Sequence, residues 1–98
     1  MEIRPGQVVV STAGRDRGRR YIVLGAIDGA HVAVVDGACR PVSRPKKKNV
    51  RHLAATRKAD GRVGSKILAG VRVTDEEVRE ALRAVDNDSR EKADWSHE

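Results

Sequence analysis

The stretch GQVVVSTAGRDRGRRYIVL, residues 6–24, constrains the fold of this 98-residue chain more than any other. Two runs rich in β-branched residues, Val8–Thr12 and Tyr21–Leu24, flank a short loop, and such runs favour strands. Gly14 and Gly18 supply the backbone angles that a tight turn needs. Arginines in and beside the loop gather positive charge there, which attracts anions. We therefore predict a small β-barrel whose first hairpin presents positive charge to a polyanion.

The positive charge is concentrated in the first part of the chain. Residues 1–58 carry thirteen Lys or Arg and four Asp or Glu, a net charge of +9, whereas residues 59–98 carry a net −3. Clustering of this kind indicates a nucleic acid as partner, although the same charge can serve only to keep a small protein in solution. One Tyr, one Trp and no Phe are too few to build a platform on which single-stranded bases stack.

Several classes of protein are disfavoured by what the sequence lacks. Cys39 is the single cysteine, which argues against a disulfide framework or a cysteine-based metal site and fits a cytoplasmic setting. No apolar run reaches the length of a membrane span, and the chain does not begin with the apolar core of a signal peptide. The barrel region holds no paired-carboxylate site, and the sequence shows no histidine–carboxylate pair at metal spacing and no phosphate loop of the nucleotide-hydrolase kind. We therefore expect no enzyme, cofactor, metal or small-molecule substrate.

The next strands follow from alternation and from turn residues. Arg19–Ile27 and His31–Val35 both alternate apolar side chains between two faces. The Asp-Gly pairs at 28–29 and 36–37 are strong hairpin turns, and two of them so close together predict an antiparallel meander.

The barrel is expected to close through three shorter segments. Cys39–Ser43 predicts a short fourth strand, and Pro41 limits it to a sheet edge or a strand end because proline cannot donate to an inner ladder. The mutually repelling side chains of Lys46–Lys48 are expected on an exposed connection. A last strand over Val50–Ala54 would then close the barrel.

Two further segments are expected after residue 55. Residues 56–64 are polar and rich in turn formers, which predicts a linker. Val63–Ala69 predicts a short helical turn with Ile67 and Leu68 pointing inward and Gly70 ending it.

Thr74–Val85 is the strongest helical pattern in the chain. Thr74 and Glu77 have the spacing of a capping box, and Val78, Ala81, Leu82 and Val85 make one apolar stripe. The domain organisation predicted is a barrel over 1–55, a linker and helix over 56–86, and a disordered tail over 87–98.

The residues from Gly6 to about Val32 resemble the KOW motif of ribosomal proteins and NusG-type transcription factors, and Gly14 matches its loop glycine. The segments RPKKKNVRHL and VTDEEVREAL are similar to the basic segment and C-terminal helix of short bacterial KOW-domain RNA-binding proteins. Those proteins in turn resemble KOW-bearing large-subunit ribosomal proteins of archaea and eukaryotes. The resemblance implies a mainly β fold, an SH3-like antiparallel barrel with a C-terminal α-helical appendage. It also implies binding of structured RNA, ribosomal RNA of the large subunit above all.

Two basic segments are the candidate contacts with RNA phosphates, because arginine forks can hold two phosphate oxygens at once. The alternatives are a solvated hairpin tip, with Asp16 pairing part of its charge, and a solvated or flexible lysine run. The expected RNA-binding residues are Arg15, Arg17, Arg19, Arg20, Arg44, Lys46, Lys47, Lys48, Arg51 and His52. Whether the two segments form one surface does not follow from the sequence.

A NusG-like module that binds a protein partner in transcription is the competing function. It predicts an exposed apolar patch and binding that is nearly indifferent to salt. Cys39 is expected to be a small strand residue, and Trp95 either anchors on a partner or is uninvolved.

Overall fold

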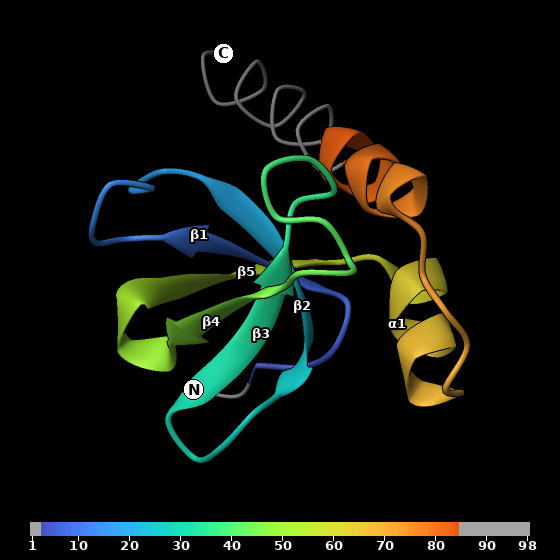
Figure 1. Ribbon diagram of the computed structural model, residues 1–98, viewed down its shortest axis with the longest axis horizontal. Coiled ribbons are helices and arrows are strands. Elements are labelled where there is room, and N and C mark those ends of the chain that lie inside the picture. The colour runs from blue at the N-terminus through green and yellow to red at the C-terminus, as the bar shows by residue number, and fades with distance from the viewer. Residues whose placement is uncertain (1–2, 85–98) are drawn as a thin grey trace, which may run out of the picture.

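The computed structural model describes residues 3–84, apart from the side chain of Arg57. These residues form a curled antiparallel sheet followed by two helices (Figure 1), which confirms the mainly β fold with a helical appendage. The strands are β1 (Gln7–Ser11), β2 (Arg20–Ala26), β3 (His31–Val35), β4 (Lys46–Asn49) and β5 (Leu53–Ala59), in the sheet order β4-β3-β2-β1-β5. The helical elements are the 3-10 turn η1 (Val50–His52), α1 (Gly61–Leu68) and a second helix over residues 75–84.

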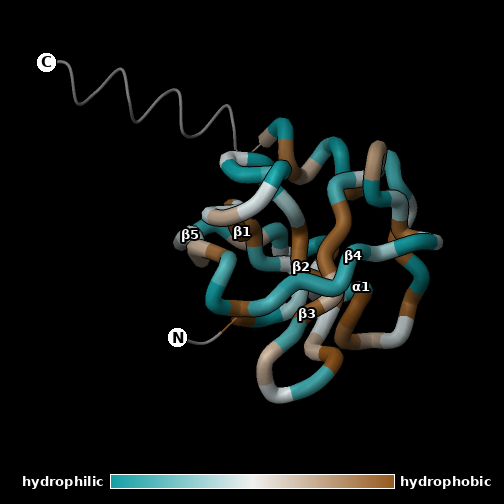
Figure 2. Tube along the Cα trace, turned by 60° about the vertical axis from the view of Figure 1, so that its left-hand side comes forward, coloured by the Kyte–Doolittle hydropathy of each residue, from teal (hydrophilic) through white to brown (hydrophobic). Residues whose placement is uncertain are grey.

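Both faces of the sheet are buried. Neighbouring residues in a strand point to opposite faces, so they enter different cores. In β1, Val8 and Val9 are both fully buried but belong to two different cores. In β2, Ile22 joins Val8 under the helices, whereas Tyr21 and Val23 join Val9 inside the curl, as the alternation predicts. The brown segments of β1, β2 and β3 in Figure 2 follow this buried interior.

Irregularities in two ladders accompany the curl of the sheet. The register shifts between Gln7 and Val9 in the β1–β5 pair and between Val23 and Gly25 in the β2–β3 pair, and bulges of this kind bend strands. The Thr56 hydroxyl donates to the carbonyl of Val8 at 2.7 Å, so a side chain replaces a missing ladder bond. Because β4 and β5 end the sheet order, the described strands make a half-barrel.

The segment between β3 and β4 differs from the prediction. Cys39–Ser43 is not a strand but part of a loop, whose backbone is bonded elsewhere than in a ladder. The N–H of Val42 donates to the carboxylate of Asp75 in the second helix at 2.7 Å, and the Asp36 carboxylate accepts two backbone N–H groups of the loop. Cys39 is therefore an exposed loop residue instead of a strand residue.

The secondary structure of residues 44–64 also differs from the prediction. Lys46–Lys48 form most of β4 instead of an exposed connection. The last strand begins at Leu53, three residues later than predicted, because η1 occupies Val50–His52. The linker over 56–64 is wrong, since β5 continues to Ala59 and α1 begins at Gly61.

The α1 helix begins two residues earlier than predicted, ends next to Gly70 as predicted, and has a partly different inward face. The Asp60 carboxylate accepts the N–H of Val63 at 2.8 Å at the N-terminus, and Gly70 follows the C-terminus with a φ of +73°. Ile67 packs against the helix-covered core as predicted, whereas Leu68 is 79% exposed.

The second helix completes the cover of the sheet. Its capping box is confirmed, because Glu77 and Thr74 exchange backbone-to-side-chain hydrogen bonds of 3.0 and 3.2 Å. Val78 is fully buried in the core shared with the sheet, and Lys66 of α1 pairs with Glu77. The predictions for Val85, Trp95 and the tail over 87–98 lie outside the described residues.

Candidate nucleic-acid interface

Asp16, in the loop between β1 and β2, joins the two basic segments that the sequence singled out. Its carboxylate accepts hydrogen bonds from the ammonium groups of Lys46 and Lys48 at 3.0 and 3.1 Å. It also accepts from the hydroxyls of Tyr21 and Ser11 at 2.7 and 2.8 Å. We call these five residues the Asp16 cluster. The cluster holds the loop over residues 13–18 against β4, although thirty residues separate them in the chain.

The charges inside the Asp16 cluster compensate one another. Burial alone would raise the pKa of Asp16, but the hydrogen bonds from Tyr21, Ser11 and the two lysines outweigh it and hold the pKa well below its usual range. Burial and the bond to Asp16 raise the pKa of Tyr21. Lys48 is only 7% exposed, a degree of burial that a lysine tolerates because its charge is paired.

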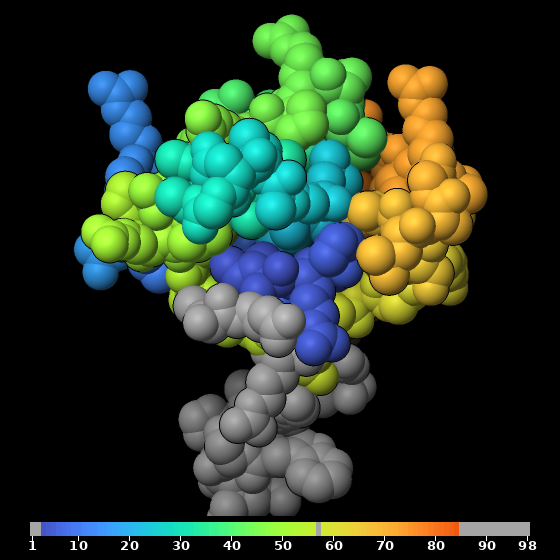
Figure 3. Space-filling model, turned by 90° about the horizontal axis from the view of Figure 1, so that it is seen from below, coloured from blue at the N-terminus to red at the C-terminus, as the bar shows by residue number. Residues whose placement is uncertain are grey.

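The turn between β4 and β5 lies beside the same loop. The N–H of Thr12 donates to the carbonyl of His52 at 2.9 Å, and the Asn49 side chain accepts the N–H of Arg51 to start η1. The loop over 13–18 and η1 project on the left in Figure 1 and Figure 3, opposite the helices. We define this part of the molecule as the basic end, formed by Arg15, Arg17, Lys46, Arg51 and His52.

The loop itself has the turn geometry that its glycines predict. Gly14 and Gly18 adopt φ angles of +84° and +89°, in the left-handed region that other residues rarely enter. The N–H of Gly18 donates to the carbonyl of Ser11 at 2.8 Å and closes the loop. Arg15 and Arg17 are exposed on either side of Asp16.

Four of the expected RNA-binding residues lie elsewhere or are engaged. Lys48 is buried in the Asp16 cluster, and Lys47 points from the other side of β4 toward Asp28, with 3.9 Å between their charged atoms. Arg19 lies 3.4 Å from the Asp36 carboxylate in the loop after β3. Arg44 lies in the loop whose Val42 is bonded to Asp75 of the second helix. Arg20, by contrast, is exposed at the start of β2, close to the loop over 13–18. Alternation along β4 and partners in other loops separate Lys47, Lys48 and Arg19 from the basic end.

The sequence reasoning missed that Asp16 joins the arginine loop to the strands at the basic end. It placed Asp16 between Arg15 and Arg17 as their possible partner, whereas its bonds go to side chains of β1, β2 and β4. One sequence signal was available, because Asp16 is the only acidic residue between positions 3 and 27. An isolated acid in a run of arginines indicates a specific partner.

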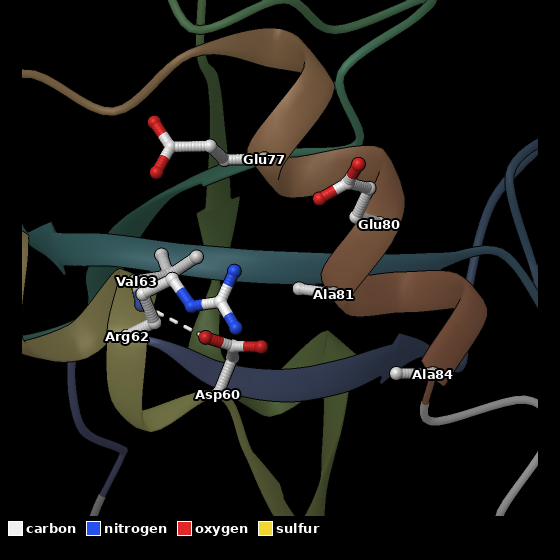
Figure 4. Close-up of a pocket in the computed structure, with 7 residues that line it drawn as sticks. All are labelled: Asp60, Arg62, Val63, Glu77, Glu80, Ala81 and Ala84. Carbon is white, nitrogen blue, oxygen red and sulfur yellow. Dashed lines mark hydrogen bonds between the residues drawn. The ribbon is translucent and has the colours of Figure 1, made fainter.

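A pocket of about 210 Å³ lies between α1 and the second helix (Figure 4). Asp60, Glu77 and Glu80 line it, but Asp60 caps α1 and Glu77 belongs to the capping box. The pocket is also smaller than the roughly 300–1,000 Å³ of typical ligand sites. Two of its three carboxylates thus have structural roles, and the basic end remains the better candidate site.

The comparisons with known proteins add no family. A scan of protein-family models and a search of curated proteins found no match to this chain. Among residues 3–84, no group of three His, Cys, Asp or Glu could hold a metal ion, and no helix is long and apolar enough to cross a membrane.

Proposed function

We propose that the chain is a non-enzymatic protein that binds structured RNA by its phosphates through the basic end. The observation that carries the proposal is the Asp16 cluster, which brings the arginine loop and the lysine strand together. Three separate segments of the chain thus contribute positive charge to one end of a small sheet. Such a concentration of charge attracts a polyanion and gives binding that weakens as salt is raised.

The burial of Tyr21 favours structured over single-stranded RNA as the target. Tyr21 is the only Phe, Trp or Tyr among residues 3–84, is 1% exposed, and bonds through its hydroxyl to Asp16. The described residues therefore offer no such ring for a base to stack on, which proteins that hold single strands commonly need. Contacts with phosphates across the shape of a duplex need no such ring.

The finer fold and the ribosomal partner belong to the same proposal. The curled sheet with its arginine loop is compatible with an SH3-like KOW barrel, the fold that the resemblance of residues 6–32 implies. On that resemblance, ribosomal RNA of the large subunit is the proposed target. A tagged chain should then co-sediment with the large subunit at low salt and leave it at high salt. Migration at the top of the gradient in both conditions would remove the ribosomal assignment.

The experiment for RNA binding itself is a salt titration with an RNA hairpin of about 16 base pairs, the span of a small duplex-binding domain. Each phosphate contact contributes about one unit to the slope of log affinity against log salt. Replacing Arg15 and Arg17 together by Ala should lower that slope by about one to two units. The matched control replaces the exposed Arg62 and Arg72, on the helical side, and should leave the slope nearly unchanged. Equal effects of the two double variants would contradict the proposal.

A protein-binding module is the second candidate, and one observation favours it. Leu68 and Val71 are 79% and 52% exposed near the end of α1, far more than apolar residues of the core. If binding of the hairpin proves absent or indifferent to salt, this patch becomes the place to seek a protein partner.

A further inference from the structure

Asp16 is an acid at the end of the molecule where the other charged groups are basic. A carboxylate there reduces the attraction of that end for phosphates, so its negative charge does not itself favour RNA binding. Its side chain is nevertheless only 11% exposed and accepts four hydrogen bonds from three strands or their ends. Asp16 would repel phosphates, yet its side chain is largely buried and hydrogen-bonded. We therefore look for its role in the shape of the loop and not in its charge.

The geometry of the loop shows what that role is. Asp16 points inward to the Asp16 cluster, and its two sequence neighbours, Arg15 and Arg17, are exposed. Lys48 adds a contact of 3.4 Å from its ammonium group to the carbonyl of Ala13 at the start of the loop. The loop is therefore fixed to β4 at two points.

We infer that Asp16 is the positioning residue of the basic end: it holds the loop over 13–18 on β4 and directs Arg15 and Arg17 outward to RNA phosphates. The inference rests on the proposed function for the identity of the ligand. The ordering of the loop does not depend on that identity. A loop that is already fixed binds without the conformational entropy cost that a flexible loop incurs.

The test uses Asp16→Ala and the matched control Asp28→Ala in the full chain. Each variant removes one negative charge, so that the net charge rises by one, and each removes an aspartate from a loop between strands. Asp28 is 48% exposed, and it accepts the N–H groups of Ala30 and His31 within its own turn. Simple electrostatics predicts that both variants bind an RNA hairpin slightly more tightly.

Positioning by Asp16 predicts opposite directions for the two variants. If the loop of Asp16→Ala is in its binding arrangement about one tenth of the time, its dissociation constant rises about tenfold. Asp28→Ala should bind as tightly as the wild type or more so. Asp16→Asn keeps an acceptor for the hydroxyls of Ser11 and Tyr21, so its dissociation constant should lie between those of the wild type and Asp16→Ala. This variant also provides the test if Asp16→Ala does not fold. The inference would be overturned if Asp16→Asn, and Asp16→Ala where it folds, bound the hairpin as tightly as Asp28→Ala does.

Amide hydrogen exchange of the free proteins separates this inference from the proposed function. Faster exchange in the Asp16 variants should be confined to the loop over 13–18 and the facing β4, whereas a general loss of stability would speed exchange throughout the core. Unchanged exchange in the loop would overturn the inference without any RNA present. Failure of the proposed function would appear separately, as absence of hairpin binding by the wild-type chain.

Discussion

Val78 provides the sharpest test that the second helix is part of the folded core. Its side chain is fully buried and belongs to the cluster that contains Val8 and Ile22 of the sheet. Val78→Ala removes two methyl groups, worth about 1.6 kcal/mol in transfer free energy at roughly 0.8 kcal/mol each. The cavity left behind raises the expected loss in the free energy of unfolding to about 2–3 kcal/mol. For a domain of this size the melting temperature should fall by about 10–20 °C.

The assay is urea unfolding followed by far-ultraviolet circular dichroism, with two reference variants. Leu68→Ala removes an exposed leucine from the neighbouring helix and should change the free energy of unfolding by less than about 0.5 kcal/mol. Ile22→Val shortens a side chain of the same core and should cost about 0.5–1.5 kcal/mol. If Val78→Ala costs no more than Leu68→Ala while Ile22→Val is destabilising, the helix does not pack on the sheet as described.

Three further predictions concern single residues. Gly37→Ala should destabilise the fold by about 2 kcal/mol or more in thermal melts, because its φ is +78° and a Cβ would lie 2.6 Å from the carbonyl oxygen of Asp75; an unchanged melting temperature would refute the contact. Lys48→Ala should cost about 1–3 kcal/mol in urea unfolding, because it removes a buried charge partner, whereas Lys47→Ala should cost less than about 0.5 kcal/mol; equal costs would contradict the assigned sides of β4. Hydrogen bonds from the N–H of Ala30 and from His31 lower the pKa of Asp28 to about 2, so its contribution to stability is present above about pH 4 and lost as the pH falls toward 2. Urea midpoints at about pH 5 and pH 2.5 should therefore differ less in Asp28→Asn than in the wild type. An equal difference would contradict a stabilising role for the ionised Asp28 side chain.

Local patterns predicted the first three strands: the first from its run of valines, and the second and third from residues that alternate between two faces. The alternation around Tyr21 and Ile22 and the Asp28–Gly29 turn depend on neighbours in the chain. The capping box at Thr74 is local in the same sense. These elements lie close to where the local sequence predicts them.

The errors fall where a distant partner decides the structure. Lys46–Lys48 repel one another in isolation, and the carboxylates of Asp16 and Asp28, both far away in sequence, offset that repulsion in the strand. The backbone of Val42 is bonded to Asp75 of a helix, which no pattern within Cys39–Ser43 could indicate. The second half of β5 has few apolar residues and is held by its pairing with β1.

The candidate site was predicted in its parts but not in its assembly. The sequence identified the arginine loop and the lysine segment, yet it could not tell which lysine faces the loop, because alternation along β4 becomes visible only when the strand is known. Arg15 and Arg17 remain candidate contacts with RNA, whereas Lys48 is buried and holds the loop through Asp16. Asp16 was underestimated, since its partners are spread over three strands.

The central claim, that the basic end binds structured RNA, is tested most directly by a footprint of the bound hairpin on the isotope-labelled protein. In a nuclear magnetic resonance titration, we predict that the backbone amide shifts concentrate in the loop over 13–18, at Lys46 and in η1. The shifts should shrink together as salt is raised, because phosphate contacts release counterions. Shifts concentrated on α1 and residues 75–84, or shifts that persist unchanged in high salt, would contradict this claim.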